Sequence, residues 1–213
     1  MMTSTAMVFV IDDDQSMRKS LKRLLDAACY KVELFRSASE FLARSAHDGP
    51  SCVVVDVRMP ELNGIDFQKA LIEGGREEHL VFVTGHGDIP MCAQAMKAGA
   101  IDFLPKPFKP KQLLESVERA LTRSAKERHR ASEKNHARSL LERLTPREYA
   151  VMQLVATGLL NKQVGAELGM AEKTVKTHRA HVMQKLSITS VAELMVVLQK
   201  AEVTPPIRPG TKV

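Results

Sequence analysis

Short apolar runs alternate with amphipathic segments through the first half of the chain. The runs are four or five residues long and rich in Val, Leu, Ile and Phe, as is typical of strands buried on both faces; they cover residues 7–11, 31–35, 52–56, 80–84 and 101–104. Between them, residues 16–28, 67–72 and 91–100 carry apolar side chains at helical spacing. Ser16 is predicted to be the N-cap of the first helix and Gly99 to end the last. This alternation predicts right-handed crossovers and a five-stranded, doubly wound parallel sheet.

The pattern changes after residue 110. One more apolar stripe completes the first domain, residues 1–122; its members are Leu113, Leu114, Val117, Ala120 and Leu121. Residues 123–141 then contain six basic and two acidic residues and no Gly or Pro. We interpret them as a solvated helical linker that continues the preceding helix. A coiled coil is not supported, because the a and d positions of a heptad would lack apolar residues.

Residues 142–213 predict a small all-α domain. Thr145 and Glu148 have the spacing of a capping box at the start of a helix. Asn161 is predicted to cap a second helix, and a turn at Gly169 leads into a third helix that is rich in Lys, Thr, His and Arg. A helix, a short turn containing Gly and a second, basic helix are typical of a helix-turn-helix.

Charge divides the chain in the same way. Residues 1–110 contain 13 Lys and Arg against 15 Asp and Glu, whereas residues 111–213 contain 18 against 10, so the second half is the candidate for binding nucleic acid. The three cysteines have no metal-ligand spacing, which fits a reducing cytoplasm. The N-terminus has no basic region, and its apolar run of five residues is too short for a signal peptide or a membrane span. We therefore expect a cytoplasmic protein with no membrane partner.

Chemically compatible side chains follow the ends of the predicted strands. Asp12 and Asp13 follow the first strand, Asp56 ends the third, Thr84 ends the fourth, and Lys106 comes just after the fifth. Sites in open α/β sheets lie at this edge. Three carboxylates held together repel one another unless a hard cation such as Mg²⁺ lies between them. The set would suit phosphorylation of a carboxylate, with Mg²⁺ and the lysine neutralising the transferred group. Each residue taken singly is more often a cap or a loop residue, so the prediction depends on the whole set.

These stretches resemble the receiver domain of bacterial two-component response regulators. The resemblance covers most of residues 6–121 through VFVIDDDQSMRKSL, VVVDVRMPELNGIDF and VFVTGHGDIPMCAQAMKAGAIDFLPKPF. It implies a flavodoxin-like fold in which Asp56 accepts phosphate from a phosphohistidine of a sensor histidine kinase. It also implies that Mg²⁺ is bound by Asp12, Asp13, Asp56 and the backbone carbonyl of Arg58.

The same resemblance assigns the residues that respond to phosphorylation. Thr84 would be the hydroxyl that senses the phosphate, Lys106 its counter-ion and Phe103 the aromatic ring whose rotamer reports the state. Lys106 stands between two prolines, which restrict its backbone, and the resemblance implies a cis peptide bond before Pro107.

The second half resembles the LuxR-type DNA-binding domain of the NarL/FixJ subfamily over residues 141–203, through LTPRE, NKQV and EKTVKTHR. The resemblance implies that Lys176 and Thr177 face a DNA groove and that Lys173 and Arg179 contact phosphates, while Thr174 lies on an exposed face beside them. It also implies a fourth helix, SVAELMVVLQKA, through which two DNA-bound copies dimerise; its candidate residues are Leu194, Val197 and Leu198. Three departures stand out, namely Gly165 and Ala180 in place of alanine and lysine, and the uncharged LSITS after the recognition helix.

The leading hypothesis is a transcription regulator, not an enzyme, that is phosphorylated by a sensor kinase, dimerises and binds double-stranded promoter DNA, with RNA polymerase as a further partner. One alternative is a Mg²⁺-dependent phosphohydrolase, but Arg58 stands where a second acid would protonate the leaving group. Another is a DNA-binding scaffold that works without phosphorylation. The sequence leaves open whether activation acts through receiver dimerisation or through relief of interdomain inhibition.

Overall fold

The computed structural model describes residues 6–85 and 89–206. The outermost residues of both predicted domains, 1–5 and 207–213, lie outside the described residues, and so does the start of the N-terminal stretch that argues against a signal peptide. The chain divides into two compact units, Met1–Arg128 and His129–Val213. Each unit has its own apolar core, as the two patterns of the sequence predict.

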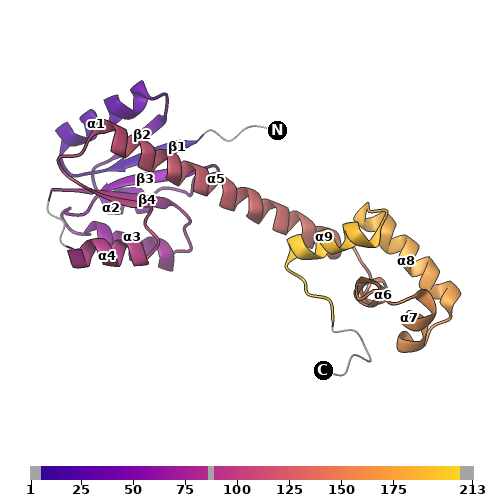
Figure 1. The fold of residues 1–213 in the computed structure, drawn as a ribbon. Helices are drawn as coiled ribbons and strands as arrows, with labels where there is room; N and C mark the ends of the chain where they lie inside the picture. The colour runs from indigo at the N-terminus through magenta and orange to yellow at the C-terminus, as the bar shows by residue number, and fades with distance from the viewer. Residues whose placement is uncertain (1–5, 86–88, 207–213) are drawn as a thin grey trace. The chain divides into compact units, whose positions relative to one another are not determined.

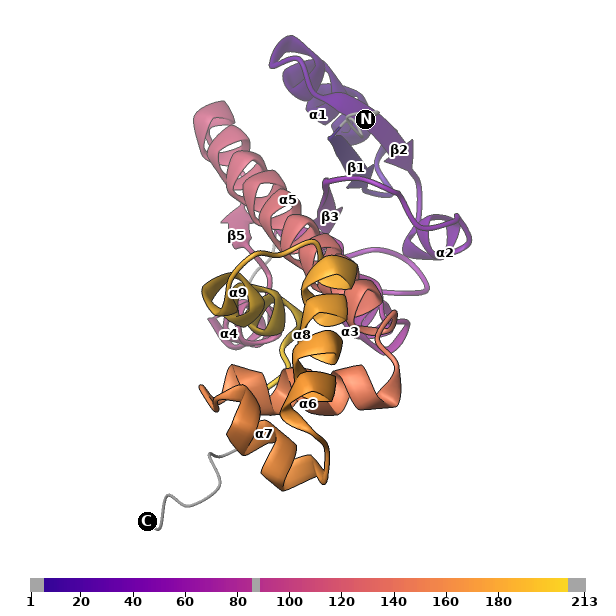
Figure 2. The ribbon, with the colours of Figure 1, turned by 90° about the vertical axis from the view of Figure 1, so that its right-hand side faces the viewer.

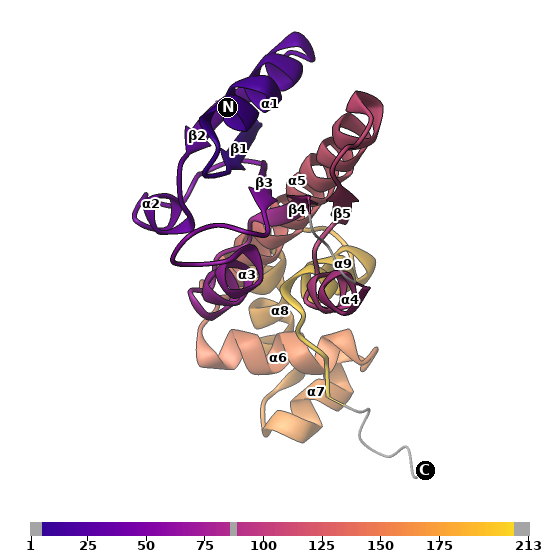
Figure 3. The ribbon, with the colours of Figure 1, turned by 90° about the vertical axis from the view of Figure 1, so that its left-hand side faces the viewer.

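The first unit contains a five-stranded, fully parallel sheet. Its strands are β1 (Met7–Ile11), β2 (Lys31–Phe35), β3 (Ser51–Asp56), β4 (His79–Thr84) and β5 (Asp102–Pro105). They lie in the order β2-β1-β3-β4-β5, which Figure 3 shows. The chain turns outward from β1 to β2 and then returns to β3 on the other side of β1, so the topological switch point lies between β1 and β3. The doubly wound fold is confirmed.

Helices cover both faces of this sheet. They are α1 (Gln15–Ala27), α2 (Ala38–Leu42), α3 (Gly64–Glu73), α4 (Ile89–Lys97) and the first part of α5 (Pro110–Leu141). Alternate residues of each strand enter opposite cores: Val8 and Val10 pack with α1 and α5, whereas Phe9 and Ile11 pack with α2, α3 and α4. Figure 1 shows the two helical layers on either side of the strands.

Helix α5 runs without a break over 32 residues, which confirms that the charged segment is helical and continues the preceding helix. The prediction that residues 123–141 are solvated is wrong at three positions. Ser124 is buried in the first unit, where its hydroxyl accepts a hydrogen bond from the backbone N–H of Ser51 at 3.1 Å. Ala137 and Leu141 belong to the core of the second unit. Two of these three residues are small, so the apolar pattern does not reveal the close packing of the helix.

The second unit packs four short helices against the end of α5. They are α6 (Pro146–Ala156), α7 (Asn161–Leu168), α8 (Glu172–Leu186) and α9 (Val191–Ala201), which Figure 2 shows together. Their common core is aliphatic and includes Val151, Met152, Val182 and Leu194. This confirms the predicted all-α domain with a helix-turn-helix.

Three helix starts test the sequence signals. The capping box of α6 is present: Thr145 donates its backbone N–H to Glu148 at 2.8 Å, and Glu148 donates to the Thr145 hydroxyl at 3.3 Å. Two predicted caps are wrong by one or two residues. Asp14, not Ser16, caps α1, because its carboxylate accepts the N–H of Ser16 at 2.7 Å. Leu160, not Asn161, is the N-cap residue of α7.

No single described helix is long and apolar enough to cross a membrane. Within the described residues, α8 and α9 meet the length and composition limits only as a pair, with a bend of 58° between them.

Candidate phosphorylation site and nucleic-acid interface

Lys106 bridges two carboxylates at the carboxyl edge of the sheet. Its ammonium lies 2.6 Å from Asp56 Oδ2 and 3.1 Å from Asp12 Oδ2. The strand register explains this meeting. Ile11 of β1 pairs with Val55 of β3, so Asp12 and Asp56 follow side by side. Thr84 of β4 pairs with Pro105 of β5, so Lys106 follows at the same edge of the sheet. The structure thus brings together Asp12, Asp56 and Lys106, which are far apart in sequence.

The other oxygen of each carboxylate is held by local backbone. Asp12 Oδ1 accepts the N–H of Asp14 at 2.8 Å, and Asp56 Oδ1 accepts the N–H of Arg58 at 3.0 Å. Both side chains are therefore fixed at two points, and both residues are buried, with 1% and 8% of their surfaces exposed. Such fixed, oxygen-rich geometry is suited to binding a hard cation or a phosphoryl group.

Burial and the ionic hydrogen bonds act in opposite directions on the pKa values of Asp12 and Lys106. Burial raises the pKa of Asp12, and the hydrogen bond from Lys106 only partly offsets it. Burial alone would lower the pKa of Lys106, but its hydrogen bonds to Asp56 and Asp12 outweigh that effect and raise the pKa. The lysine is therefore held as the cation that the two acids require.

Asp13 is less closely integrated. Asp13 is exposed. Within the described part of the chain, the carboxylate oxygens of Asp12, Asp13 and Asp56 do not all lie within 4.8 Å of one another. Three carboxylates at this edge repel one another unless a cation lies among them, and the Lys106 ammonium contacts both Asp12 and Asp56. The donor set still fits Mg²⁺, because every predicted ligand is a hard oxygen.

Sequence reasoning missed Arg18, which stabilises the acidic loop. Its guanidinium donates from Nη1 to the carbonyl oxygens of Asp12 and Asp13, at 2.5 and 2.9 Å. A long side chain that reaches back from α1 to two backbone carbonyls leaves no sign in the hydrophobic pattern. The only available signal is the position of a basic residue in the first turn after the aspartates.

The predicted switch residues lie on the two neighbouring strands β4 and β5 and in the loop that follows β5. Thr84 is buried at the end of β4, and its carbonyl oxygen accepts the backbone N–H of Lys106 at 2.7 Å. Phe103 is half-buried and packs beside Phe82, with ring centroids 6.0 Å apart. The Lys106–Pro107 peptide bond is cis, as the resemblance implies.

A second missed residue is Gly64, the first residue of α3. A Cβ atom there would lie 2.8 Å from the carbonyl oxygen of Asp56 and 3.0 Å from Phe82, so only glycine fits. Its N–H donates to the carbonyl of Val57 at 2.8 Å, which draws the loop after β3 under the pocket.

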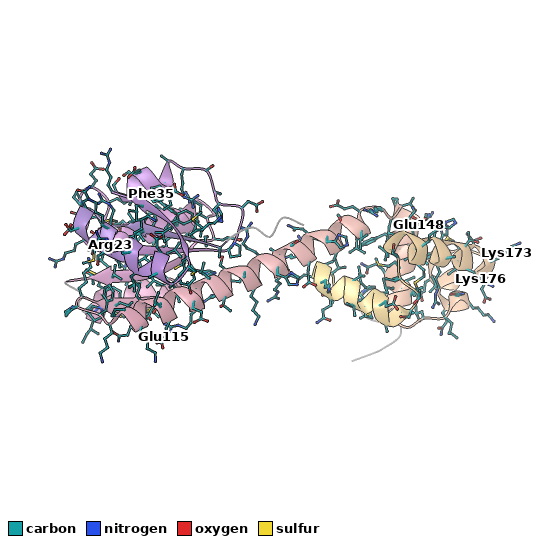
Figure 4. The ribbon with its side chains drawn as sticks, turned by 90° about the horizontal axis from the view of Figure 1, so that it is seen from above. Arg23, Phe35, Glu115, Glu148, Lys173 and Lys176 are labelled. Carbon is teal, nitrogen blue, oxygen red and sulfur yellow. The ribbon has the colours of Figure 1, made fainter. Side chains whose placement is uncertain are left out.

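The other candidate surface is the exposed side of α8. Val175, Val182 and Leu186 are buried against the unit, whereas the residues predicted to face DNA are exposed; these are Lys173, Thr174, Lys176 and Thr177. Figure 4 shows Lys173 and Lys176 near the start of α8, whereas Glu148 of α6 lies near the other end of that helix. A basic, exposed helix face on a helix-turn-helix is the usual surface for the major groove.

Arg179 differs from its neighbours on α8. It is half-buried, and its Nη1 donates to Asn161 Oδ1 at 3.1 Å. This contact ties α8 to the first residue of α7. Asn161 follows the N-cap Leu160, so its side chain is free of the capping role and can accept the bond from Arg179.

The predicted dimerisation residues need correction. Leu194 and Leu198 are buried in the core of the second unit, with 0% and 1% of their surfaces exposed, and Val197 is half-buried. The large apolar residues exposed on α9 are Met195 and Val196, at 41% and 50%. The α9 helix is hydrophobic on both sides, so its sequence does not reveal which side faces inward.

Comparisons with known proteins find a match for each of the two units. Residues 8–118 match the family described as the response regulator receiver domain, and residues 142–198 match the bacterial regulatory proteins of the luxR family. The chain belongs to the response regulators with a LuxR-type DNA-binding domain. Members of this family are transcription regulators that bind DNA under the control of phosphorylation, and they are not typically enzymes. Their receiver domains generally bind Mg²⁺ at the phosphorylation site.

Relatives match over nearly the whole chain. Nodulation protein W of Bradyrhizobium diazoefficiens is 49% identical over 91% of this chain and 85% of its own length. Transcriptional regulatory protein FixJ of the same species is 37% identical over 94% of this chain and 98% of its own. Among solved structures, the response regulator StyR gives a TM-score of 0.85 at 45% identity, covering 92% of this chain and 99% of StyR.

Proposed function

We propose that Asp56 of this response regulator accepts a phosphoryl group from a phosphohistidine of a sensor histidine kinase, and that this modification promotes dimerisation and binding to promoter DNA. The observation that carries the proposal is the Lys106 ammonium, held 2.6 Å from Asp56 and 3.1 Å from Asp12. A fixed cation beside a buried carboxylate is suited to stabilising negative charge that arrives during the reaction.

In the transfer, a carboxylate oxygen of Asp56 attacks phosphorus while the phosphorus–nitrogen bond to the donor imidazole breaks. The bonding electrons leave with that nitrogen, and a new phosphorus–oxygen bond forms on Asp56. Lys106 remains close enough to pair with an oxygen of the phosphoryl group, and the N–H of Arg58 continues to orient the carboxylate. Asp12, Asp13, Asp56 and the carbonyl of Arg58 would hold Mg²⁺, which when bound neutralises the phosphoryl oxygens.

Thr84 and Phe103 would then transmit the change. The Thr84 hydroxyl would move to donate a hydrogen bond to the phosphoryl group, and the Phe103 ring would move into the space that is vacated. Phe103 lies in β5 and Ile89 begins α4, so this movement would remodel the face that these two elements form. A modification biases such an equilibrium only through its different interaction with the two states.

On the second unit, α8 would enter the major groove. Lys176 and Thr177 would face the groove, with Lys173 and Thr174 beside them, while Arg179 would contact a phosphate with the donors that Asn161 leaves unused. DNA-bound copies would pair through Met195 and Val196 on α9, with RNA polymerase as a further partner. A regulator that binds promoter DNA and RNA polymerase would act in the cytoplasm.

The test is phosphorylation of the purified protein by acetyl phosphate. We expect the mass of one phosphoryl group to be added only when Mg²⁺ is present, and not at all in Asp56→Asn. Asp13→Ala should abolish Mg²⁺ binding and the phosphorylation that depends on it. Asp26→Asn is a matched control, because Asp26 pairs with Lys22 on the surface of α1. Unimpaired phosphorylation of Asp56→Asn would overturn the proposal.

A further inference from the structure

Two histidines with no role above meet, between α6 and α8, the glutamate of the α6 capping box. Glu148 lies on α6, and His178 and His181 lie three residues apart on α8, a spacing that puts them on one helix face. One potential ligand atom from each lies within 4.8 Å of the other two. Among residues 6–85 and 89–206, no other group of three His, Cys, Asp or Glu residues meets this condition.

The Glu148 carboxylate has one oxygen in use and one directed at the histidines. Oε2 accepts both the backbone N–H of Thr145 at 2.8 Å and the Lys185 ammonium at 2.6 Å. Oε1 lies 3.6 Å from Nδ1 of His181. The two bonds to Oε2 fix the orientation of the carboxylate, which is the task that outer hydrogen bonds perform for metal-binding carboxylates.

His178 provides an independent observation. Its Nδ1 atom is buried and has no hydrogen-bond partner within the part of the chain that the structure describes. A buried polar atom normally has a hydrogen-bond partner, so the lack of a partner at Nδ1 calls for an explanation. This nitrogen does not hold the imidazole to a neighbouring protein group, so the ring can serve as a ligand.

The ligand types and separations fit zinc. In a tetrahedral site with zinc–nitrogen bonds of 2.0–2.1 Å, the donor atoms lie about 3.3 Å apart. Glu148 Oε1 and His181 Nδ1 are already close to that separation. Two imidazoles and one carboxylate suit Zn²⁺, whereas Mg²⁺ prefers oxygen alone. Lys185 stays on the other oxygen, and because 36% of its side chain is exposed, the high dielectric of water weakens its repulsion of a cation.

We propose that Glu148, His178 and His181 bind a Zn²⁺ ion, with the fourth position open to water. The ion would join α6 to α8 on the side of α8 opposite Lys176, with Thr177 one helical turn before His181. Because the ion binds the folded unit, it would stabilise the helix-turn-helix by an amount that grows with the logarithm of the zinc concentration relative to the dissociation constant. Binding requires neutral imidazoles, so affinity falls in acid.

The test uses the full-length protein, stripped with a chelator and kept in excess Mg²⁺ so that the aspartate pocket is occupied. Titration with Co²⁺ should give the intense visible absorption of a tetrahedral site at one equivalent, and Zn²⁺ should displace it. His181→Gln should weaken binding at least about tenfold, the loss known even for an outer hydrogen-bond partner of a metal site. His136→Gln is the control, because His136 is an exposed histidine of the same unit.

Two results would overturn the proposal: no tetrahedral cobalt spectrum, or unchanged affinity in His181→Gln, which would place the metal elsewhere. His181 has 53% of its side chain exposed, so its replacement should leave the fold intact. His178→Gln should weaken binding in the same way. If that variant unfolds, the ring resonances of His178 in the unmodified protein decide the matter: they must shift when Zn²⁺ is added.

Discussion

At Gly165, two effects on stability act in opposite directions. Alanine in place of glycine inside a helix gains about 1 kcal/mol from helix propensity. However, a Cβ atom at this position would lie 2.6 Å from the carbonyl oxygen of Met170, which is backbone and cannot turn away. The close approach explains why glycine stands here although the related domains generally have alanine.

We therefore expect Gly165→Ala to destabilise the second unit by about 1–3 kcal/mol, the usual cost of overpacking. Urea unfolding followed by circular dichroism would measure it. Ala166→Gly is a neighbouring control on the exposed side of α7, and it should lose about 1 kcal/mol through propensity alone. A rise in the unfolding midpoint of Gly165→Ala would mean that Met170 can move aside.

Lys176 is the single residue that best tests the DNA surface. Lys176→Ala should weaken specific binding by about 1–3 kcal/mol if the ammonium contacts a base edge. If it contacts only phosphate, the loss should be similar on all sequences and the salt slope should fall by about one. Binding measured by fluorescence anisotropy at several salt concentrations separates the two cases. Lys126→Ala removes the same charge from α5 and should change neither quantity; an unaltered affinity in Lys176→Ala would move the recognition surface elsewhere.

Some site residues could be predicted because the fold itself brings them together. Parallel strands that end at or just before Asp12, Asp56 and Lys106 must place these residues at one edge, whatever the details of packing. Arg18 and Gly64 could not be found in this way. The role of Arg18 depends on where a long side chain reaches, and the role of Gly64 depends on how closely a loop passes under Asp56. Neither property has a periodic signature in the sequence.

At the scale of elements, all five strands were predicted to within one residue at each end. Their apolar runs are short, continuous and separated by polar residues, so tertiary context has little to change. The five-residue helix α2 was missed because it is too short to show a helical period. The phase of α9 was also missed, since Met195 and Val196 are as apolar as the buried Leu194 and Leu198 beside them.

The junction of α6 and α8 gives a prediction for pH. The ammonium of Lys185 and the backbone N–H of Thr145 lower the pKa of Glu148 from 4.5 to about 2. Because the folded state lowers this pKa, the stabilisation is fully present above pH 4.5 and is lost as the pH falls towards 2. The loss is at most about 3 kcal/mol, from 1.36 kcal/mol for each pKa unit.

Melting temperatures of the second unit between these pH values would measure the effect. Glu148→Gln should be less stable than the unmodified protein at neutral pH, and the difference should shrink as the pH falls. Glu167→Gln is a control that makes the same chemical change, since Glu167 is exposed on α7. An equal difference between Glu148→Gln and the unmodified protein at every pH would show that the carboxylate charge is not the source of the stability.

At the scale of the whole molecule, the two halves of the chain suit different partners. The acidic front half contains the carboxylate pocket, and the excess of basic residues lies in the half that contains α8. The receiver also has exposed apolar residues on α4, where Ile89 and Met96 are 86% and 42% exposed. Such residues are suited to pairing with a second receiver once the neighbouring β5 rearranges.

The last prediction concerns that pairing. Two receivers held together would present two α8 helices to a repeated or inverted half-site, so affinity for DNA would rise through effective concentration and not through new base contacts. We expect sedimentation with beryllofluoride at fixed Mg²⁺ to show a dimer, with partial dimerisation at high concentration without it, because phosphorylation only shifts an existing equilibrium. Met96→Glu should reduce dimerisation in solution, whereas Val196→Glu on α9 should spare it and weaken only the complex with DNA. A protein that stays monomeric in both states but binds DNA more tightly when modified would show that activation works by relief of interdomain inhibition instead.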